Sequence, residues 1–273
     1  ISKQTYNINN QVCQRKPRVE GVDLTYVQHG INENIYKPIT EEDKGFNDYF
    51  NFIAERGYDK FDSVFFFNSR NIRRKMVSDL ILSYRLFCDS LTKEESDKCL
   101  LLLHTDPVDQ NGTDLPALIR ALCPNYNVEF STGKLPNNQL NYLYNVASLT
   151  CQPSSAEGFG LSVMESIMSG TPALGSVIGG IQDQLGFMHD DGTPVTLSDF
   201  SAEWPSNSDG KYTKHGEWAF PCWPQINLQG SPMTPYIYDS RPSVKDMAKQ
   251  LKNIQKLGRK ELKRRGKIGR KWA

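Results

Sequence analysis

The sequence lacks paired metal-ligand motifs, long apolar runs and an excess of either charge. Its six cysteines include no CxxC pair and its four histidines stand apart, so the spacing typical of zinc sites is missing. The longest apolar runs, SVFFF and CLLLL, are too short to span a bilayer, and we predict no transmembrane helix. The 32 Lys and Arg nearly balance the 31 Asp and Glu, which argues against a dedicated nucleic-acid-binding protein. We expect reduced thiols and a cytoplasmic location.

The chain has enough apolar residues to bury a substantial core. Its 273 residues are 38% hydrophobic, which favours one large domain or two small ones. Charge is uneven only at the end, where residues 252–273 hold ten basic residues and the single acid Glu261. The favoured interpretation of this segment is a solvated helix face. Weak contact with a membrane surface or a polyanion is the alternative, and it would make the protein peripheral at a membrane.

Short apolar runs alternate with amphipathic stretches from residue 62 onward, a pattern that predicts a parallel sheet with helices on both faces. The fold class is therefore α/β, with a Rossmann-like doubly wound sheet. The expected strands are 63–68, 99–105, 127–132, 148–153 and 171–176. The expected helices are 72–88, 115–122 with Asp114 as its cap, 136–147 and 160–169.

Two segments break this rhythm. Residues 186–240 are rich in glycine, proline and aromatic residues without a helical period, and we interpret them as an irregular insertion. Residues 24–32, LTYVQHGIN, favour a strand that ends in a turn at Gly30. Internal repeats and low-complexity tracts are absent from the sequence.

The stretch SSAEGFGLSVMESIMSG, residues 154–170, combines two glutamates with a glycine turn after an expected strand. Gly158 and Gly160 leave backbone amides accessible near a helix start, which suits an anion or a sugar hydroxyl. Helical rise places Glu157 and Glu165 up to roughly 12 Å apart. Paired hydrolytic carboxylates lie within about 9.5 Å, so the two glutamates better suit the two ends of an extended ligand such as a nucleoside diphosphate sugar. A solvated Glu165 and a helix-capping Glu157 remain the alternative.

A second group of charged residues follows the first expected strand, in NSRNIRRKM. Arg70 and Lys75 lie where two cations can hold a diphosphate and stabilise the charge that develops as it leaves. Arg73 and Arg74 are better interpreted as ordinary basic surface.

These motifs together resemble the retaining GT-B glycosyltransferases, specifically glycosyltransferase family 4, the glycosyl transferases group 1. PSSAEGFGLSVMESIMSGTP resembles their E-x7-E signature, and FFFNSRNIRRK their arginine and lysine segment, with Ser69 where glycine is usual. YVQHGIN resembles the hinge that leads out of the first domain, with His29 in place of asparagine, and VIGGI the glycine-rich turn after the signature. The resemblance extends over about residues 20–182.

The resemblance implies roles for the site residues. Glu165 would bind the ribose, Glu157 the transferred sugar, and Arg70 and Lys75 the diphosphate. The backbone amides would come from Gly158, Phe159, Gly160 and Leu161, and the nucleobase would lie near Ser131, Gly133 and Lys134. The implied reaction transfers a hexosyl group from a UDP-, GDP- or ADP-sugar with retention of anomeric configuration. It uses no cofactor and, as a rule in the family, no metal.

The resemblance also implies that the chain is half of an enzyme. Residues 1–38 would be the tail of an N-terminal domain and the hinge, and residues 39–273 the C-terminal donor-binding domain of a GT-B fold. The missing N-terminal domain would bind the acceptor, so a glycan, a lipid and a protein all remain open. The alternatives are a GT-B epimerase or phosphorylase and a non-catalytic subunit that binds a sugar or a partner protein.

Overall fold

The computed structural model describes residues 2–15, 24–200 and 206–273, and within them it forms a six-stranded parallel sheet. The strand order is β3-β2-β1-β4-β5-β6, which confirms the Rossmann-like doubly wound fold. The strands are β1 (Ser63–Asn68), β2 (Cys99–His104), β3 (Val128–Phe130), β4 (Leu149–Gln152), β5 (Ala173–Ser176) and β6 (Ala219–Cys222). The five strands expected from the sequence are all present, and β6 extends the sheet within the segment that we interpreted as irregular.

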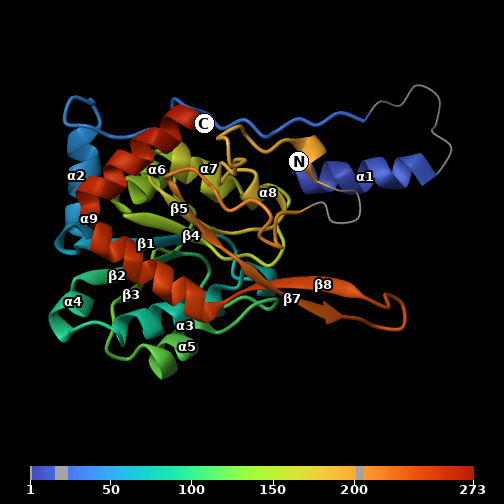
Figure 1. Cartoon of the computed structure of the whole chain (residues 1–273). Coiled ribbons are helices and arrows are strands. Elements are labelled where there is room, and N and C mark those ends of the chain that lie inside the picture. Colours follow the sequence, from blue (N-terminus) through green and yellow to red (C-terminus); the bar gives the residue numbers. More distant parts are fainter. Residues whose placement is uncertain (1, 16–23, 201–205) are drawn as a thin grey trace.

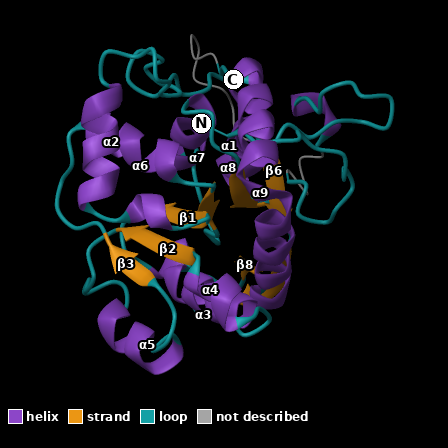
Figure 2. Ribbon diagram, turned by 90° about the vertical axis from the view of Figure 1, so that its left-hand side faces the viewer, coloured by secondary structure: helices purple, strands orange, loops and turns teal. Residues whose placement is uncertain are grey.

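Helices cover both faces of the sheet (Figure 1). They are α1 (Lys3–Arg15), α2 (Phe46–Glu55), α3 (Val77–Cys88), α4 (Lys93–Asp97), α5 (Leu115–Leu122), α6 (Asn137–Val146), α7 (Leu161–Met168), α8 (Gly179–Gln182) and α9 (Val244–Trp272). Short 3₁₀ turns are η1 (Tyr58–Lys60), η2 (Arg73–Lys75) and η3 (Leu197–Asp199). Figure 2 shows α2 and α6 on one side of β1, β2 and β3, and α3 and α5 on the other.

The alternation of side chains along β1 explains why the strand is apolar throughout. Phe65 and Phe67 belong to the core beneath α3 and α9, whereas Val64 and Phe66 belong to the core beneath α2 and α6. All four side chains are fully buried. A strand covered on both faces needs a continuous apolar run, and β1 and β2 show it.

Two expectations for local structure are wrong. The helix expected at 72–88 is divided, because Met76 adopts a left-handed conformation with φ of 53° between η2 and α3. Residues 24–32 form no strand, because no described strand lies beside them to pair with their backbone. The cap at Asp114 is confirmed, since its carboxylate accepts a hydrogen bond from the Ala117 amide at 2.9 Å.

The segment at 186–240 is more regular than its composition suggests. Besides β6 it contains the antiparallel strands β7 (Pro224–Gln229) and β8 (Ile237–Pro242), a hairpin that extends away from the sheet in Figure 1. Arg241 in β8 forms two 2.7 Å hydrogen bonds with the buried carboxylate of Asp79 in α3, which attaches the base of the hairpin to the core. Residues 201–205 of this segment, like residues 1 and 16–23 of the expected N-terminal tail, lie outside the described residues.

The basic C-terminal segment forms most of α9. The helix is kinked at Gly258, whose φ is 71°, and one side of it is buried against the sheet through Leu251, Ile254 and Leu262. The cations lie mostly on the exposed side, which agrees with the interpretation of this segment as a solvated helix face.

Candidate functional site

The site lies where the strand order reverses. From β1 the chain builds outward through β2 to β3, then returns to place β4 against the other side of β1. Loops that follow β1 and β4 must therefore diverge, and the space between them is where open α/β sheets bind ligands. These two loops, residues 69–76 and 153–160, contain both motifs singled out in the sequence.

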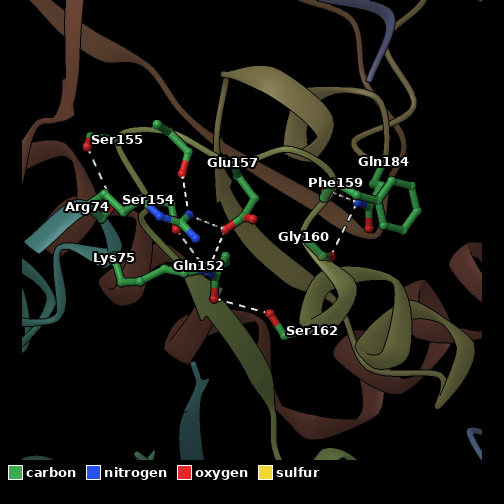
Figure 3. A network of polar contacts seen from close by, with 11 residues as sticks. Arg74, Lys75, Gln152, Ser154, Ser155, Glu157, Phe159, Gly160, Ser162 and Gln184 are labelled. Atoms are coloured by element: carbon green, nitrogen blue, oxygen red, sulfur yellow. Dashed lines mark hydrogen bonds and ion pairs between the residues drawn. The ribbon is translucent and has the colours of Figure 1, made fainter. Parts of the chain in front are cut away.

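Glu157 joins the two loops through two cations (Figure 3). Its carboxylate contacts the Lys75 ammonium and lies 3.2 Å from the Arg74 guanidinium, which also donates to the Ala156 carbonyl at 2.8 Å. The side chains of Lys75 and Glu157 are only 11% and 12% exposed, and burial lowers the pKa of Lys75 below its ordinary value. The interpretation of Arg74 as ordinary basic surface is wrong, because the backbone turn of η2 directs it at Glu157.

Arg70 lies at the same edge of the sheet but has a different partner. Its guanidinium pairs with Asp109, in the loop after β2, at 2.7 Å, and it is largely exposed. The structure thus places Arg70 and Lys75 on one loop and holds each with its own carboxylate. The fully buried Asn71 between them fixes this loop to its neighbour, because its amide donates to the Thr113 carbonyl at 2.7 Å.

The glycine-containing loop 153–160 is held by a buried polar network. Gln152 donates to the Ser154 hydroxyl at 2.9 Å and accepts from Ser162 in α7 at 3.2 Å. Behind the loop, the Gln184 amide donates to the Phe159 carbonyl at 2.6 Å. These bonds leave Gly158 exposed and fix the start of α7, where Gly160 has a φ of 91° that favours glycine.

The glycine-rich turn at 177–181 supports the same loop by close backbone contact. The Gly180 amide donates to the Glu157 carbonyl at 3.1 Å. A Cβ on Gly180 would lie 2.3 Å from the Cα of Phe159, so no larger residue fits without moving the loop. Phe159 is buried, and its ring lies 5.0 Å from the ring of His29 in the expected hinge segment. Leu161 opens α7 with a half-exposed side chain.

Glu165 is not a solvated helix residue. Its carboxylate accepts a 2.6 Å hydrogen bond from Tyr144, whose hydroxyl in turn accepts one from Asn68 at the end of β1 at 2.8 Å. Tyr36 also hydrogen-bonds Glu165. Burial raises the pKa of Glu165 despite these hydrogen bonds, so the carboxylate is held in a poorly solvated place beside the carboxyl end of β1.

The three residues expected at the nucleobase follow β3. The Ser131 carbonyl and hydroxyl lie 2.8 and 3.2 Å from Nδ1 of His104, which ends β2. Burial lowers the pKa of His104 below its ordinary value. Gly133 has a φ of 79° with open space around it, and Lys134 is exposed. His104 was not among the site residues expected from the sequence, although it lies at the carboxyl end of an expected buried strand, where open α/β sheets bind ligands.

A cavity of about 670 Å³ opens over Glu157 and Arg74. Its wall includes loop 155–158, Ile178 and Gly179, and also parts of the chain that the sequence did not connect with the site. These are Gln4, Thr5, Ile8 and Gln11 of α1, and Ser206, Ser208, Tyr238 and Ser240. Gln4 accepts a hydrogen bond from the Gly179 amide at 2.8 Å, which fixes α1 against α8.

The part of the chain that contains this site matches a known protein family. The family model for glycosyl transferases group 1 matches residues 51–192, which is just over half of the chain. The chain belongs to the glycosyl transferases group 1 family. The matched segment contains β1 to β5 and every expected site residue, from Arg70 to Glu165.

Solved structures share the fold of this group 1 glycosyltransferase chain. A sucrose-phosphate synthase from Thermosynechococcus elongatus is 18% identical with a TM-score of 0.61, over 99% of this chain and 51% of that one. A glycosyltransferase from Rickettsia africae ESF-5 is 12% identical with a TM-score of 0.63, over 97% and 56%. Anabaena Alr3699/HepE in complex with UDP is 15% identical with a TM-score of 0.59, over 91% and 52%. No curated protein matches the sequence.

The chain therefore spans about half the length of these structures. Within residues 2–15, 24–200 and 206–273, no group of three or more metal-ligating side chains is gathered as it would be around an ion. Nor does any helix in the same ranges have the length and apolar character needed to cross a membrane.

Proposed function

We propose that this group 1 glycosyltransferase chain is the donor-binding half of a retaining enzyme of family 4. It would transfer a hexosyl group from a nucleotide sugar to an acceptor hydroxyl. The other half would be an N-terminal domain, to which residues 1–38 form the tail and hinge, and it would supply the acceptor site. The proposed location is the cytoplasm, with the acceptor a glycan, a lipid or a protein.

The convergence of Lys75 and Arg74 on Glu157 carries this proposal. Two cations at the reversal point of the sheet form a site for the two phosphates of a nucleoside diphosphate, because such groups carry several negative charges. In the structure Arg74 and Lys75 both form ion pairs with the Glu157 carboxylate. A bound diphosphate would replace that partner and free the carboxylate for the hydroxyls of the transferred sugar.

The chemistry required of these residues is charge stabilisation. When the bond between the anomeric carbon and the phosphate oxygen breaks, its electron pair stays on the diphosphate. Lys75, Arg74 and Arg70 would stabilise that charge, with the helix start of α7 adding backbone amides from Gly158 to Leu161. The buried carboxylate of Glu165 would accept hydrogen bonds from the ribose diol, and Ser131, Gly133 and Lys134 would lie beside the base.

Calorimetric titration of the chain with UDP, GDP and ADP tests the donor site directly. We expect one nucleotide to bind more tightly than the other two, and Arg74→Gln to weaken it by about tenfold or more, because a charge-assisted hydrogen bond contributes about 1.5–3 kcal/mol. Arg73→Gln is the matched control, since Arg73 is exposed on the same turn and its side chain makes no hydrogen bond or ion pair with another described residue. Equal affinity in both variants would contradict the site.

Activity assays distinguish the proposed transferase from a non-catalytic subunit and from an epimerase. In the full-length protein, replacing Lys75 by methionine should lower kcat more than it raises KM if the cation stabilises the departing diphosphate. A non-catalytic subunit would bind the nucleotide without turning over the nucleotide sugar, and an epimerase would interconvert sugars without consuming an acceptor.

A further inference from the structure

Another cavity, of about 430 Å³, lies at the amino ends of the strands, whereas the donor site lies at their carboxyl ends. Its floor is formed by residues 145–148 and 169–172, which lead into the amino ends of β4 and β5. Residues 38–41 and α2 form one wall, and α9 forms the other. The cavity therefore has no residue in common with the donor site.

Three cations of α9 line this cavity. Arg259, Lys263 and Lys267 are spaced four residues apart, which places them along one side of the helix. Arg259 donates to the backbone carbonyls of Phe61 and Asp62 at 3.0 and 3.2 Å and has no carboxylate partner in the described chain. Lys263 and Lys267 are exposed and make no hydrogen bond or ion pair with any described residue. Their charge is thus available to a ligand.

Several uncharged polar side chains of the lining already have hydrogen-bond partners. The Ser148 hydroxyl accepts from the Val64 amide, the Ser169 hydroxyl donates to Asn141, and the Thr171 hydroxyl donates to the Tyr144 carbonyl. Glu41 is the acid in the lining, and it forms no ion pair with the α9 cations. The charged side chains of the cavity are therefore three cations and one carboxylate.

The aromatic residues of the lining lie on α2, whereas the lysines lie on α9. Phe46 and Tyr49 of α2 present their rings there, 6.3 Å apart between centroids, and Ile39 lies beside them. A ligand with a charged end and an organic body would meet cations on one side and aromatic rings on the other. The volume falls within the roughly 300–1,000 Å³ typical of small-molecule sites.

The positions of the lysines are fixed by close packing of α9. Gly266, between Lys263 and Lys267, approaches the loop before β5 so closely that a Cβ would lie 1.8 Å from the Gly170 carbonyl oxygen. One turn further, Arg270 donates to the Met168 carbonyl at 2.7 Å. The helix backbone is therefore held against the cavity floor, and the cations are presented from a rigid element.

We propose that this cavity binds a phosphate monoester with a small organic body. The phosphate would lie between Lys263 and Lys267, because an ammonium is a compact charge suited to a phosphate oxygen. The organic body would lie against Phe46 and Tyr49. The ligand is either a soluble phosphate ester or the headgroup of a phospholipid, which share this chemistry. Ligand binding in this cavity does not depend on the proposed transferase activity, because the cavity lies at the amino ends of the strands and the donor site at their carboxyl ends.

Two measurements on the chain test the proposal and distinguish the two sources. The first is calorimetric titration with glycerol 3-phosphate, and the second is co-sedimentation with phosphatidylcholine vesicles with and without phosphatidic acid. The test variant is Lys263→Gln with Lys267→Gln. The matched control is Lys245→Gln with Lys249→Gln, which changes two exposed lysines with the same spacing on the same helix outside the cavity. Circular dichroism checks that both double variants fold.

We expect the test variant to lose at least about tenfold in affinity for one of the two probes, because each lysine contributes a charge-assisted hydrogen bond. The control and Lys75→Met, which removes a cation at the donor site, should bind as the unchanged chain does. Loss of glycerol 3-phosphate binding assigns a soluble ligand, whereas loss restricted to phosphatidic acid vesicles assigns a lipid headgroup. Equal binding by the test and control variants, or no binding of either probe, would overturn the proposal.

Discussion

Replacing Glu157 by glutamine removes the charge that Lys75 and Arg74 share without changing the shape of the side chain. Lys75 is then a buried ammonium whose pKa is already lowered by burial and which has lost its carboxylate. Breaking a buried ion pair costs about 3–5 kcal/mol, and the partly exposed Arg74 and some solvent access favour the lower value, about 3 kcal/mol. For a chain of this size that loss corresponds to a fall in Tm of roughly 5 °C.

The assay is thermal unfolding with and without the nucleotide that binds best. A nucleoside diphosphate brings negative charge to Lys75 and Arg74, so it should raise the Tm of Glu157→Gln more than that of the unchanged chain. Glu261→Gln is the control, because Glu261 also pairs with two cations, Arg264 and Arg265, but at the surface. Its effect on Tm should be much smaller. If Glu157→Gln unfolds at the same temperature as the control and gains no more from nucleotide than the unchanged chain does, Glu157 does not stabilise the two cations.

Three further predictions concern other parts of the site. Glu165→Ala should weaken nucleotide binding about tenfold by removing hydrogen bonds to the ribose, and calorimetry showing unchanged affinity would reject the ribose assignment. Gly180→Ala should weaken nucleotide binding because its Cβ would displace the Phe159 backbone, whereas Gly30→Ala, in open space, should not. Burial raises the pKa of Asp183 from 3.8 to about 6, so the folded protein keeps a proton that the unfolded chain releases. This contribution to stability is present below pH 3.8 and is lost as pH rises through about 6. Urea unfolding at several pH values should show that loss in the unchanged chain and not in Asp183→Asn.

The sheet was predictable because its sequence signal is local and strong. Strands buried on both faces need unbroken apolar runs, and β1 and β2 are the clearest of these. β6 was not predictable in the same way, since its four residues, AFPC, include a proline and lie in a segment rich in glycine and aromatic residues. Its place at the edge of the sheet depends on pairing with β5, a contact that no local pattern encodes.

Two charged residues of the candidate site were expected from the sequence, but Arg74 and the pairing of the three were not. Glu157 and Lys75 could be named from their positions after expected strands. The contact between them depends on the left-handed turn at Met76, which divides the expected helix and directs both Arg74 and Lys75 toward loop 153–160. The sequence could not show that α1 forms part of the cavity wall, because Gln4 is separated from its partner Gly179 by 175 positions.

The cavity over Glu157 is assembled from three distant stretches of the chain. The stretch that the family shares, residues 51–192, supplies the cations, the carboxylate and the glycine turns. The walls formed by α1 and by residues 206–240 lie entirely outside it. The charged centre of the cavity and much of the surface around it are therefore encoded by separate stretches of the chain. If the cavity holds the donor as proposed, exchanging the two outer stretches between relatives would change the surface around the ligand and leave the charged centre intact.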